Sequence, residues 1–288
     1  MLHWAWTGDF RYAVDGNMDQ GIHFISGLPR SGSTLLAALL RQNPRFHAGI
    51  ISPAGGLFTV VTRAMGQDNE TAVFVDDPKR RAVLRGLFDN YYEQEHPRQV
   101  VFDTNRLWAA KLGALKELFP EARTICCVRH PPWIFDSVER LVQRNPLQAS
   151  KIFNFEAATT VYARYEMIGA GTGLVGYAFN ALREAFYGPH SDRLMLLTYE
   201  TLASDPARAM RAVYEFIGEP EFPHRFDQVE FSNDEFDVRL GAPGLHTVRP
   251  TVGHTPRETI LPPDLFRRVE KDAFWGAPDA KRRGVPII

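Results

Sequence analysis

Apolar residues recur along the chain in short runs that alternate with longer segments of helical period. Four runs bounded by glycine or polar residues predict buried strands: "GIHFIS" at 21–26, "RQVVFDT" at 98–104, "ARTICCV" at 122–128 and "DRLMLLTY" at 192–199. A further short strand can fit within "QNPRFHAG" at 42–49. Strands that alternate with helices build βαβ units, so the pattern predicts an α/β fold in three layers, with a central parallel sheet flanked by helices.

Apolar positions spaced three and four apart predict the helices between these strands. One begins near Ser33, and others cover 55–65, 77–94, 107–119, 131–143, 155–186 and 204–218. Asp77 and Asp205 are expected to cap two of them, because each precedes a proline that suits a first helical turn. After Gly218 the chain is rich in Pro and Gly and predicts a long ordered tail, with one short helix near 262–274.

Composition and charge narrow the class of protein. The chain has 288 residues, of which 44% are hydrophobic and 23% charged, and no linker or repeat divides it. We therefore expect an N-terminal extension over 1–20 and a single domain over 21–288, with Met18 as an alternative start. A net charge of -1 argues against a partner bound through nucleic-acid phosphates. No membrane-length apolar run or signal-peptide pattern is present, which favours a cytoplasmic protein, and Cys126 and Cys127 are expected to be buried reduced thiols.

The segment "GLPRSGSTLL" at 27–36 carries the first candidate chemistry. It follows a predicted strand and opens a predicted helix, and Gly27 and Gly32 have the spacing of the nucleotide-binding pattern GxxxxGK[ST]. Backbone amides in such a turn converge on an oxyanion at the positive end of the helix. Ser33 stands where an ATP-binding loop has its lysine, and the cation of this loop is Arg30 instead. The planar fork of an arginine suits two oxygens of one bound group.

This loop resembles the 5′-phosphosulfate loop of sulfotransferases that use 3′-phosphoadenosine 5′-phosphosulfate (PAPS). It is most similar to the form in tyrosylprotein sulfotransferases and many bacterial relatives, which have Arg where cytosolic enzymes carry Lys. The resemblance implies a P-loop type of three-layer fold, PAPS as co-substrate, a hydroxyl acceptor and no metal. It places the donor against Arg30, Ser31, Gly32, Ser33, Thr34 and Leu35.

The second motif of that family is an Arg at the end of a strand, followed eight residues later by a Ser on the next helix. "CCVRHPPWIFDSVERL" supplies Arg129 and Ser137 at this spacing, with His130 where the family more often has Asp. In the family this pair binds the 3′-phosphate. The segment from Tyr199, "YETLASDP", resembles a third family segment and implies that Tyr199 lies near the adenine. In the tail, the resemblance brings Arg249 and Arg257 towards the donor as basic candidates.

The general base is open at the sequence level. Tyrosylprotein sulfotransferases use a Glu after the loop helix, but "AGIISPAGGLF" contains no carboxylate. Cytosolic sulfotransferases use a His in a K-T-H step, and the corresponding step here is "DTNR" at 103–106. We therefore expect Asp103 as base and Arg106 as a stabiliser of the sulfuryl group, with His47 as the second candidate base. The competing interpretation is that Asp103 caps the helix near Leu107 or pairs with Arg106.

Two other functions fit parts of the sequence. A P-loop kinase or NTPase would need magnesium and a loop lysine, and Ser33 speaks against it. A non-catalytic nucleotide-binding relative would explain the missing Glu and His. The nine histidines show no HxxH or HExxH spacing, so no metal site is expected. The acceptor is left open, as is a homodimer.

Overall fold

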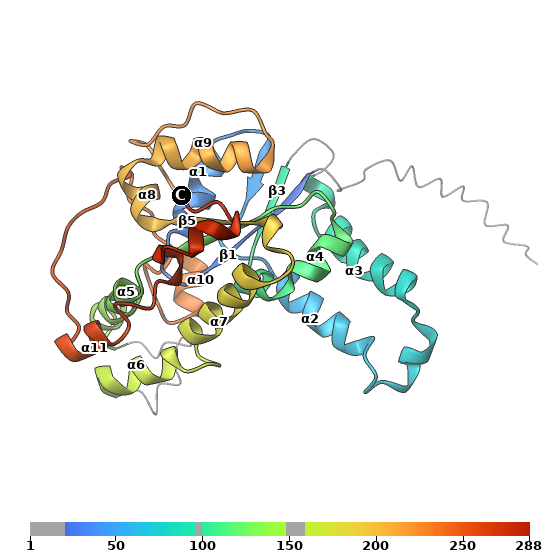
Figure 1. Cartoon of the computed structure of the whole chain (residues 1–288), viewed down its shortest axis with the longest axis horizontal. Coiled ribbons are helices and arrows are strands. Elements are labelled where there is room, and N and C mark those ends of the chain that lie inside the picture. The colour runs from blue at the N-terminus through green and yellow to red at the C-terminus, as the bar shows by residue number, and fades with distance from the viewer. Residues whose placement is uncertain (1–20, 96–99, 148–158) are drawn as a thin grey trace, which may run out of the picture.

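The structure is a computed structural model that describes residues 21–95, 100–147 and 159–288; the expected extension over 1–20 lies outside them. Its centre is one sheet of five parallel strands in the order β2-β3-β1-β4-β5 (Figure 1). The strands are β1 (Ile22–Gly27), β2 (Phe46–Ala48), β3 (Val100–Thr104), β4 (Thr124–Val128) and β5 (Leu194–Thr198). The predicted parallel α/β fold is confirmed, including the short strand within 42–49.

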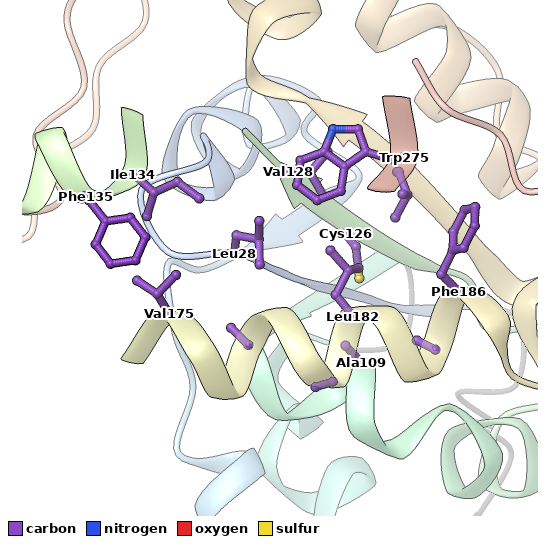
Figure 2. Packing of buried hydrophobic residues seen from close by; sticks show 14 of the residues in the cluster. Leu28, Ala109, Cys126, Val128, Ile134, Phe135, Val175, Leu182, Phe186 and Trp275 are labelled. Atoms are coloured by element: carbon purple, nitrogen blue, oxygen red, sulfur yellow. The ribbon is translucent and has the colours of Figure 1, made fainter. Parts of the chain in front are cut away.

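Helices cover both faces of this sheet. One face packs on α1 (Ser33–Leu40), α8 (Tyr199–Ser204) and α9 (Pro206–Ile217). The other packs on α2 (Ala54–Ala64), α3 (Asp77–Tyr91), α4 (Leu112–Leu118), α5 (Pro131–Arg144), α6 (Val161–Gly169) and α7 (Leu174–Tyr187). Side chains alternate between the faces of a strand, so Cys126 lies in the core against α7 (Figure 2) and Cys127 in the core against α1 and α9. Both cysteines are free and buried, as the sequence predicts.

Several helix boundaries differ from the sequence expectations for local reasons. Asp76, not Asp77, caps α3, because its side chain accepts a hydrogen bond from the N–H of Lys79 at 2.9 Å. The helix expected over 107–119 starts as a 3₁₀ turn, Arg106–Lys111, before α4. Two short helices were not predicted, α8 and α10 (Asp234–Arg239), since six residues are too few to show a period and no proline marks their first turn. In the tail, α11 (Pro263–Arg268) matches the expected short helix.

The order of the strands fixes where a ligand can bind. From β1 the chain passes to the edge strand β2, returns to β3 between β2 and β1, and then crosses to the other side of β1 to form β4. The carboxyl ends of β1 and β4 therefore lie side by side at the point where the connections diverge. In open α/β sheets the crevice at this point is the usual ligand site. The loop after β1 and Arg129 after β4 both lie there.

Gly27, the last residue of β1, is required by its close contact with β4. Its φ is +108°, and a Cβ at this position would lie 2.2 Å from the carbonyl oxygen of Cys127. Gly27→Ala is therefore expected to lower the free energy of unfolding by about 3 kcal/mol or more, measured by urea denaturation.

Gly56 provides the control for this substitution. It lies in α2 with a normal helical backbone, and a Cβ there would have nothing within 4 Å. Gly56→Ala is expected to leave stability unchanged or raise it by up to about 1 kcal/mol, through helix propensity. Equal effects of the two substitutions would contradict the role assigned to Gly27.

Candidate active site

A cavity of about 1460 Å³ opens at the carboxyl ends of the strands. It is lined by the end of β1 and the following loop, by the residues after β3 and β4, by one side of α5, by the start of α8 and by the segment 236–257. Arginines dominate its charge: among the residues that the structure describes, seven arginines line it against one carboxylate, Glu200. The arginines are Arg30, Arg106, Arg129, Arg140, Arg144, Arg249 and Arg257. This composition suits a ligand with several negative charges.

The loop after β1 forms one wall of the cavity. Arg30 has a φ of +58°, in the left-handed region, and Gly32 follows at +94° as the residue before α1. The Nε of Arg30 donates to Ser137 Oγ at 3.0 Å, and its Nη1 donates to the carbonyl oxygen of Leu245. Burial and the nearby Arg129 lower the pKa of Arg30 to about 10. A non-glycine residue in the left-handed region, with a second arginine close by, is typical of a loop that binds a charged ligand.

The remaining loop residues divide between the cavity and the interior. Gly32, Ser33, Thr34 and Leu35 line the cavity. Ser31 does not: its side chain is fully buried and its hydroxyl donates back to the carbonyl oxygen of Pro29 at 3.3 Å. The hydroxyl of Ser31 is therefore not available to a ligand in the cavity.

Arg129 and Ser137 meet the loop from the other side. The Nη1 of Arg129 donates to the carbonyl oxygen of Arg30 at 3.2 Å, and its guanidinium lies over the ring of Tyr199, 4.2 Å from the centroid. A Cβ on Gly32 would lie 3.1 Å from the Tyr199 ring, which explains a glycine there. The two motifs, a hundred residues apart in sequence, thus form one continuous wall with Tyr199.

Two buried polar atoms on this wall have no hydrogen-bond partner within the part of the chain that the structure describes. They are Nε of Arg129 and Oγ1 of Thr104, and both residues line the cavity. An unpartnered buried donor carries a desolvation penalty that a bound acceptor removes. The lining therefore includes one residue with an unpartnered charged donor, Arg129, and one with an unpartnered hydroxyl, Thr104, which is a composition that suits an anion.

The tail closes the cavity through a buried carboxylate on α5. Asp136 is fully buried and accepts hydrogen bonds from Arg140 Nε at 3.0 Å, from Ile260 N–H at 2.9 Å and from Arg257. The guanidinium of Arg257 also lies over the ring of Trp133, 5.6 Å from the centroid. This network holds Arg257 at the cavity. Arg249 also lines it, with Nη1 donating to Thr255 Oγ1 at 3.3 Å.

Asp103 does not reach the cavity, so its expected role as base needs correction. The side chain is fully buried on β3 and accepts hydrogen bonds from Ser52 Oγ and Tyr92 Oη, both at 2.6 Å, and from Trp108 Nε1 at 2.7 Å. A base must come within hydrogen-bond reach of the proton that it removes, and this carboxyl lies outside the cavity lining. It does not cap the next helix either: Asn105 accepts from the N–H of Leu107 at 3.0 Å.

The other residues of this step have different positions. Arg106 lines the cavity as expected. His47, the second candidate base, lies on β2 with its ring packed on Tyr92 at a centroid distance of 5.7 Å and is not part of the lining.

Burial raises the pKa of Asp103, although its three donors oppose the effect. The carboxyl is thus a packing element that ties β3 to the segment before α2 and to the 3₁₀ turn.

Asp103→Asn is expected to lower the free energy of unfolding by about 2 kcal/mol, because an amide cannot accept all three hydrogen bonds. Nucleotide affinity, measured by calorimetry, is expected to change less than about threefold, since the side chain does not face the cavity. Tyr92→Phe removes one of the donors and is the matched variant, with a smaller loss of stability. Unchanged stability combined with loss of catalytic turnover would restore Asp103 as a candidate base.

The sequence did not predict a histidine at the cavity, His246, or the buried carboxylate behind it, Asp237. His246 lines the cavity, and its Nδ1 lies 2.5 Å from Oδ1 of Asp237 on α10. The backbone N–H of His246 donates to Oδ2 of the same fully buried carboxylate at 2.8 Å. Only the short segment "DVRLGAPGLH" links the two in sequence, and the left-handed Gly241 and Gly244 are the one local signal for its tight return.

Two classes of feature are absent from the described part of the chain. No cluster of three or more His, Cys, Asp or Glu side chains in 21–95, 100–147 and 159–288 could hold a metal ion. Over the same ranges, every helix is too short or too polar to cross a membrane.

One solved structure supports the fold, and two others are similar to this chain over much of its length. The sulfotransferase domain from the curacin biosynthetic pathway is 15% identical, with a TM-score of 0.54, and the match covers 90% of this chain and 99% of that one. The sulfotransferase domain from the Synechococcus PCC 7002 olefin synthase is 15% identical over 89% of this chain and 95% of that one, with a TM-score of 0.47. A sulfotransferase from Alicyclobacillus acidocaldarius is 17% identical over 76% and 90%, with a TM-score of 0.45.

Comparison with protein families identifies the chain more closely than these structures do. No curated protein matches it. The closer resemblance to tyrosylprotein sulfotransferases stays a prediction. The model of a sulfotransferase family matches residues 23–224, well over half of the chain and including the loop after β1, Arg129 and Tyr199. The chain therefore belongs to the sulfotransferase family.

Proposed function

We propose that this protein transfers a sulfuryl group from PAPS to a hydroxyl acceptor. The observation that carries the proposal is the arginine-rich cavity wall, in which Arg129 has a buried Nε without a partner among the described residues. Arg129 lies over the ring of Tyr199 and donates to the carbonyl oxygen of Arg30, whose own side chain donates to Ser137. A nucleotide with two separate phosphate groups and an aromatic base fits a wall of this composition.

Each part of the donor has a candidate partner on this wall. The amides at the start of α1 and the hydroxyls of Ser33 and Thr34 suit the 5′-phosphosulfate. Arg129 and Ser137 suit the 3′-phosphate, and Tyr199 suits the adenine. Arg257, which Asp136 and Trp133 hold at the cavity, suits the same end of the nucleotide.

The reaction is an in-line displacement at sulfur. The acceptor oxygen forms a bond to sulfur as the bond between sulfur and the 5′-phosphate oxygen breaks, and the bisphosphate nucleotide leaves with the electron pair. Charge grows on the bridging oxygen and persists on the sulfuryl oxygens, so fixed cations stabilise the transition state. Arg30 and Arg106 are the cations that we assign to this task, because both line the cavity near the loop.

A kinase or NTPase is the weaker alternative. Ser33 stands at the lysine position, and Arg30 lies inside the loop rather than after it. A non-catalytic relative would bind the same nucleotide. It differs from the proposed enzyme only in that it does not transfer the sulfuryl group. Binding measurements address the first alternative, and transfer measurements address the second.

Calorimetric titration with adenosine 3′,5′-bisphosphate, adenosine 5′-monophosphate and ATP tests the proposal. We expect the bisphosphate to bind at least about 100-fold more tightly than the monophosphate, because two charge-assisted hydrogen bonds to the 3′-phosphate are lost in the latter. The affinity is expected to be insensitive to a chelator of divalent cations. Tight binding of ATP that requires magnesium, with no binding of the bisphosphate, would contradict the proposal.

A further inference from the structure

We propose that His246 is the general base that removes the proton from the acceptor hydroxyl, and that Asp237 positions it. This inference rests on the proposed function and assigns the one role that the motifs leave without a residue. It starts from the pair of contacts between these two side chains and from their place beside Arg30.

The carboxylate of Asp237 is bound by His246 through both of its oxygens. Its side chain is fully buried on α10, and both of its oxygens accept hydrogen bonds from the same residue, Oδ2 from the backbone and Oδ1 from the ring of His246. Burial of a carboxylate is unfavourable unless strong donors compensate it. Here the compensation comes from one histidine, so the carboxylate fixes both the position of that residue and the orientation of its ring.

The contact with Asp237 selects one tautomer of the His246 imidazole. An ionised carboxylate only accepts hydrogen bonds, so Nδ1 of His246 carries the proton that it donates to Asp237. Nε2 then keeps its lone pair on the opposite side of the ring, which is the form that a general base requires. The ring of Phe236 packs on the imidazole at a centroid distance of 5.6 Å and limits its rotation.

His246 lies on a segment that contacts Arg30. Leu245, the preceding residue, accepts a hydrogen bond from Nη1 of Arg30 through its carbonyl oxygen. This contact keeps the segment that carries the imidazole beside Arg30, and the charges of Arg30 and Arg106, the two cations that we assign to the sulfuryl group, both act on the ring. Because an attacking oxygen must approach sulfur there, a base on this segment lies where the acceptor proton has to be removed.

The charged groups around the imidazole favour its neutral form. Burial lowers the pKa of His246 below its usual 6.5, Asp237 raises it in part, and Arg30 and Arg106 lower it further. The ring is therefore ready to accept a proton near neutral pH. In the reaction, Nε2 takes the hydroxyl proton as the oxygen–sulfur bond forms and later releases it to water, while the bisphosphate leaves with the electrons of the broken bond.

Other candidates around the cavity fit less well. The backbone N–H of His130 donates to Glu200 at 3.3 Å, and its Nε2 contacts the carbonyl oxygen of Glu270 at 2.8 Å. Both residues lie on the wall assigned to the nucleotide, near Tyr199 and Arg129. His254 is exposed on the tail. None of them combines a buried carboxylate partner with attachment to Arg30.

The test separates nucleotide binding from transfer. Adenosine 3′,5′-bisphosphate is titrated into each variant, and transfer is followed from PAPS labelled with ³⁵S to phenol, n-octanol and water. His246→Asn is expected to bind the bisphosphate within about threefold of the wild type and to lose transfer by about 100-fold or more. His246→Gly supplied with free imidazole is expected to regain transfer in proportion to the imidazole concentration. His190→Asn, at a residue outside the cavity lining, is the matched control.

Asp237→Asn provides the readout for a positioning residue. It removes the group that raises the pKa of His246, so the acid limb of the pH–rate profile is expected to move to lower pH while the maximum rate falls. Transfer by His246→Asn within about threefold of the wild type overturns the proposal. An acid limb that stays unchanged in Asp237→Asn overturns it as well. Failure of the wild type to bind the bisphosphate instead overturns the proposed function, and the base assignment falls with it.

Discussion

Arg129→Ala is expected to weaken binding of adenosine 3′,5′-bisphosphate by about 100-fold or more. Two charge-assisted hydrogen bonds from the guanidinium to the 3′-phosphate are lost, at about 1.5–3 kcal/mol each. Adenosine 5′-monophosphate, which lacks that phosphate, is expected to lose less than about fivefold. The measurement is the calorimetric affinity of both nucleotides for both proteins. The ratio of the two affinities is the quantity that reports a 3′-phosphate site.

Two variants frame this result. Arg129→Lys keeps the charge but loses the planar fork, so its bisphosphate affinity is expected to lie between the wild type and the alanine variant. Arg208→Ala removes an exposed arginine of α9 and controls for net charge. An equal loss of affinity for both nucleotides in Arg129→Ala would contradict a contact between Arg129 and the 3′-phosphate. The loss would then come from the loop after β1, because Arg129 donates to the carbonyl oxygen of Arg30.

Arg30→Ala is expected to lower the rate of sulfuryl transfer by about 100- to 1000-fold. A fixed donor to the charge that develops in a transition state has effects of this size. The guanidinium is already constrained, because Ser137 and Leu245 accept its hydrogen bonds and its backbone is left-handed. Transfer from labelled PAPS, at saturating donor, measures the effect on turnover apart from binding.

The backbone of Arg30 supplies the control for this variant. Glycine adopts a φ of +58° without the steric cost that a Cβ carries, so Arg30→Gly is expected to be more stable than Arg30→Ala by about 1 kcal/mol. Both variants are expected to lose transfer equally. Activity that follows the stability of the two variants, instead of the missing side chain, would contradict a direct role for Arg30.

Much of the fold and one wall of the cavity follow from the sequence because they depend on local patterns. Apolar runs identify the strands of a buried parallel sheet, and the spacing of Gly27 and Gly32 predicts the glycine-rich turn between β1 and α1. The close contact of Gly27 with Cys127 needed the structure. Arg129 and Ser137 stand at a strand end and on the next helix, so their placement follows from the parallel topology. Their direct connection to Arg30 needed the structure.

The expected base could not be derived correctly, since its position depends on contacts between distant segments. Asp103 ends a strand as a catalytic residue would, yet three donors from Ser52, Tyr92 and Trp108 hold it in the core. His246 lies in a Pro/Gly-rich segment with no period, and only the tertiary return to Asp237 reveals it. Helices of six residues, such as α8 and α10, are missed for a similar reason.

Transfer of the sulfuryl group from PAPS is the activity that we propose for this cavity. The most direct measurement follows ³⁵S from labelled PAPS in the presence of a panel of phenols, sugars and alkanols, with a chelator of divalent cations present. We expect the label to move to at least one hydroxyl acceptor, with one bisphosphate nucleotide released per sulfate transferred. Retention of the label on the donor with every acceptor and with water, under conditions in which the bisphosphate binds, would contradict the claim.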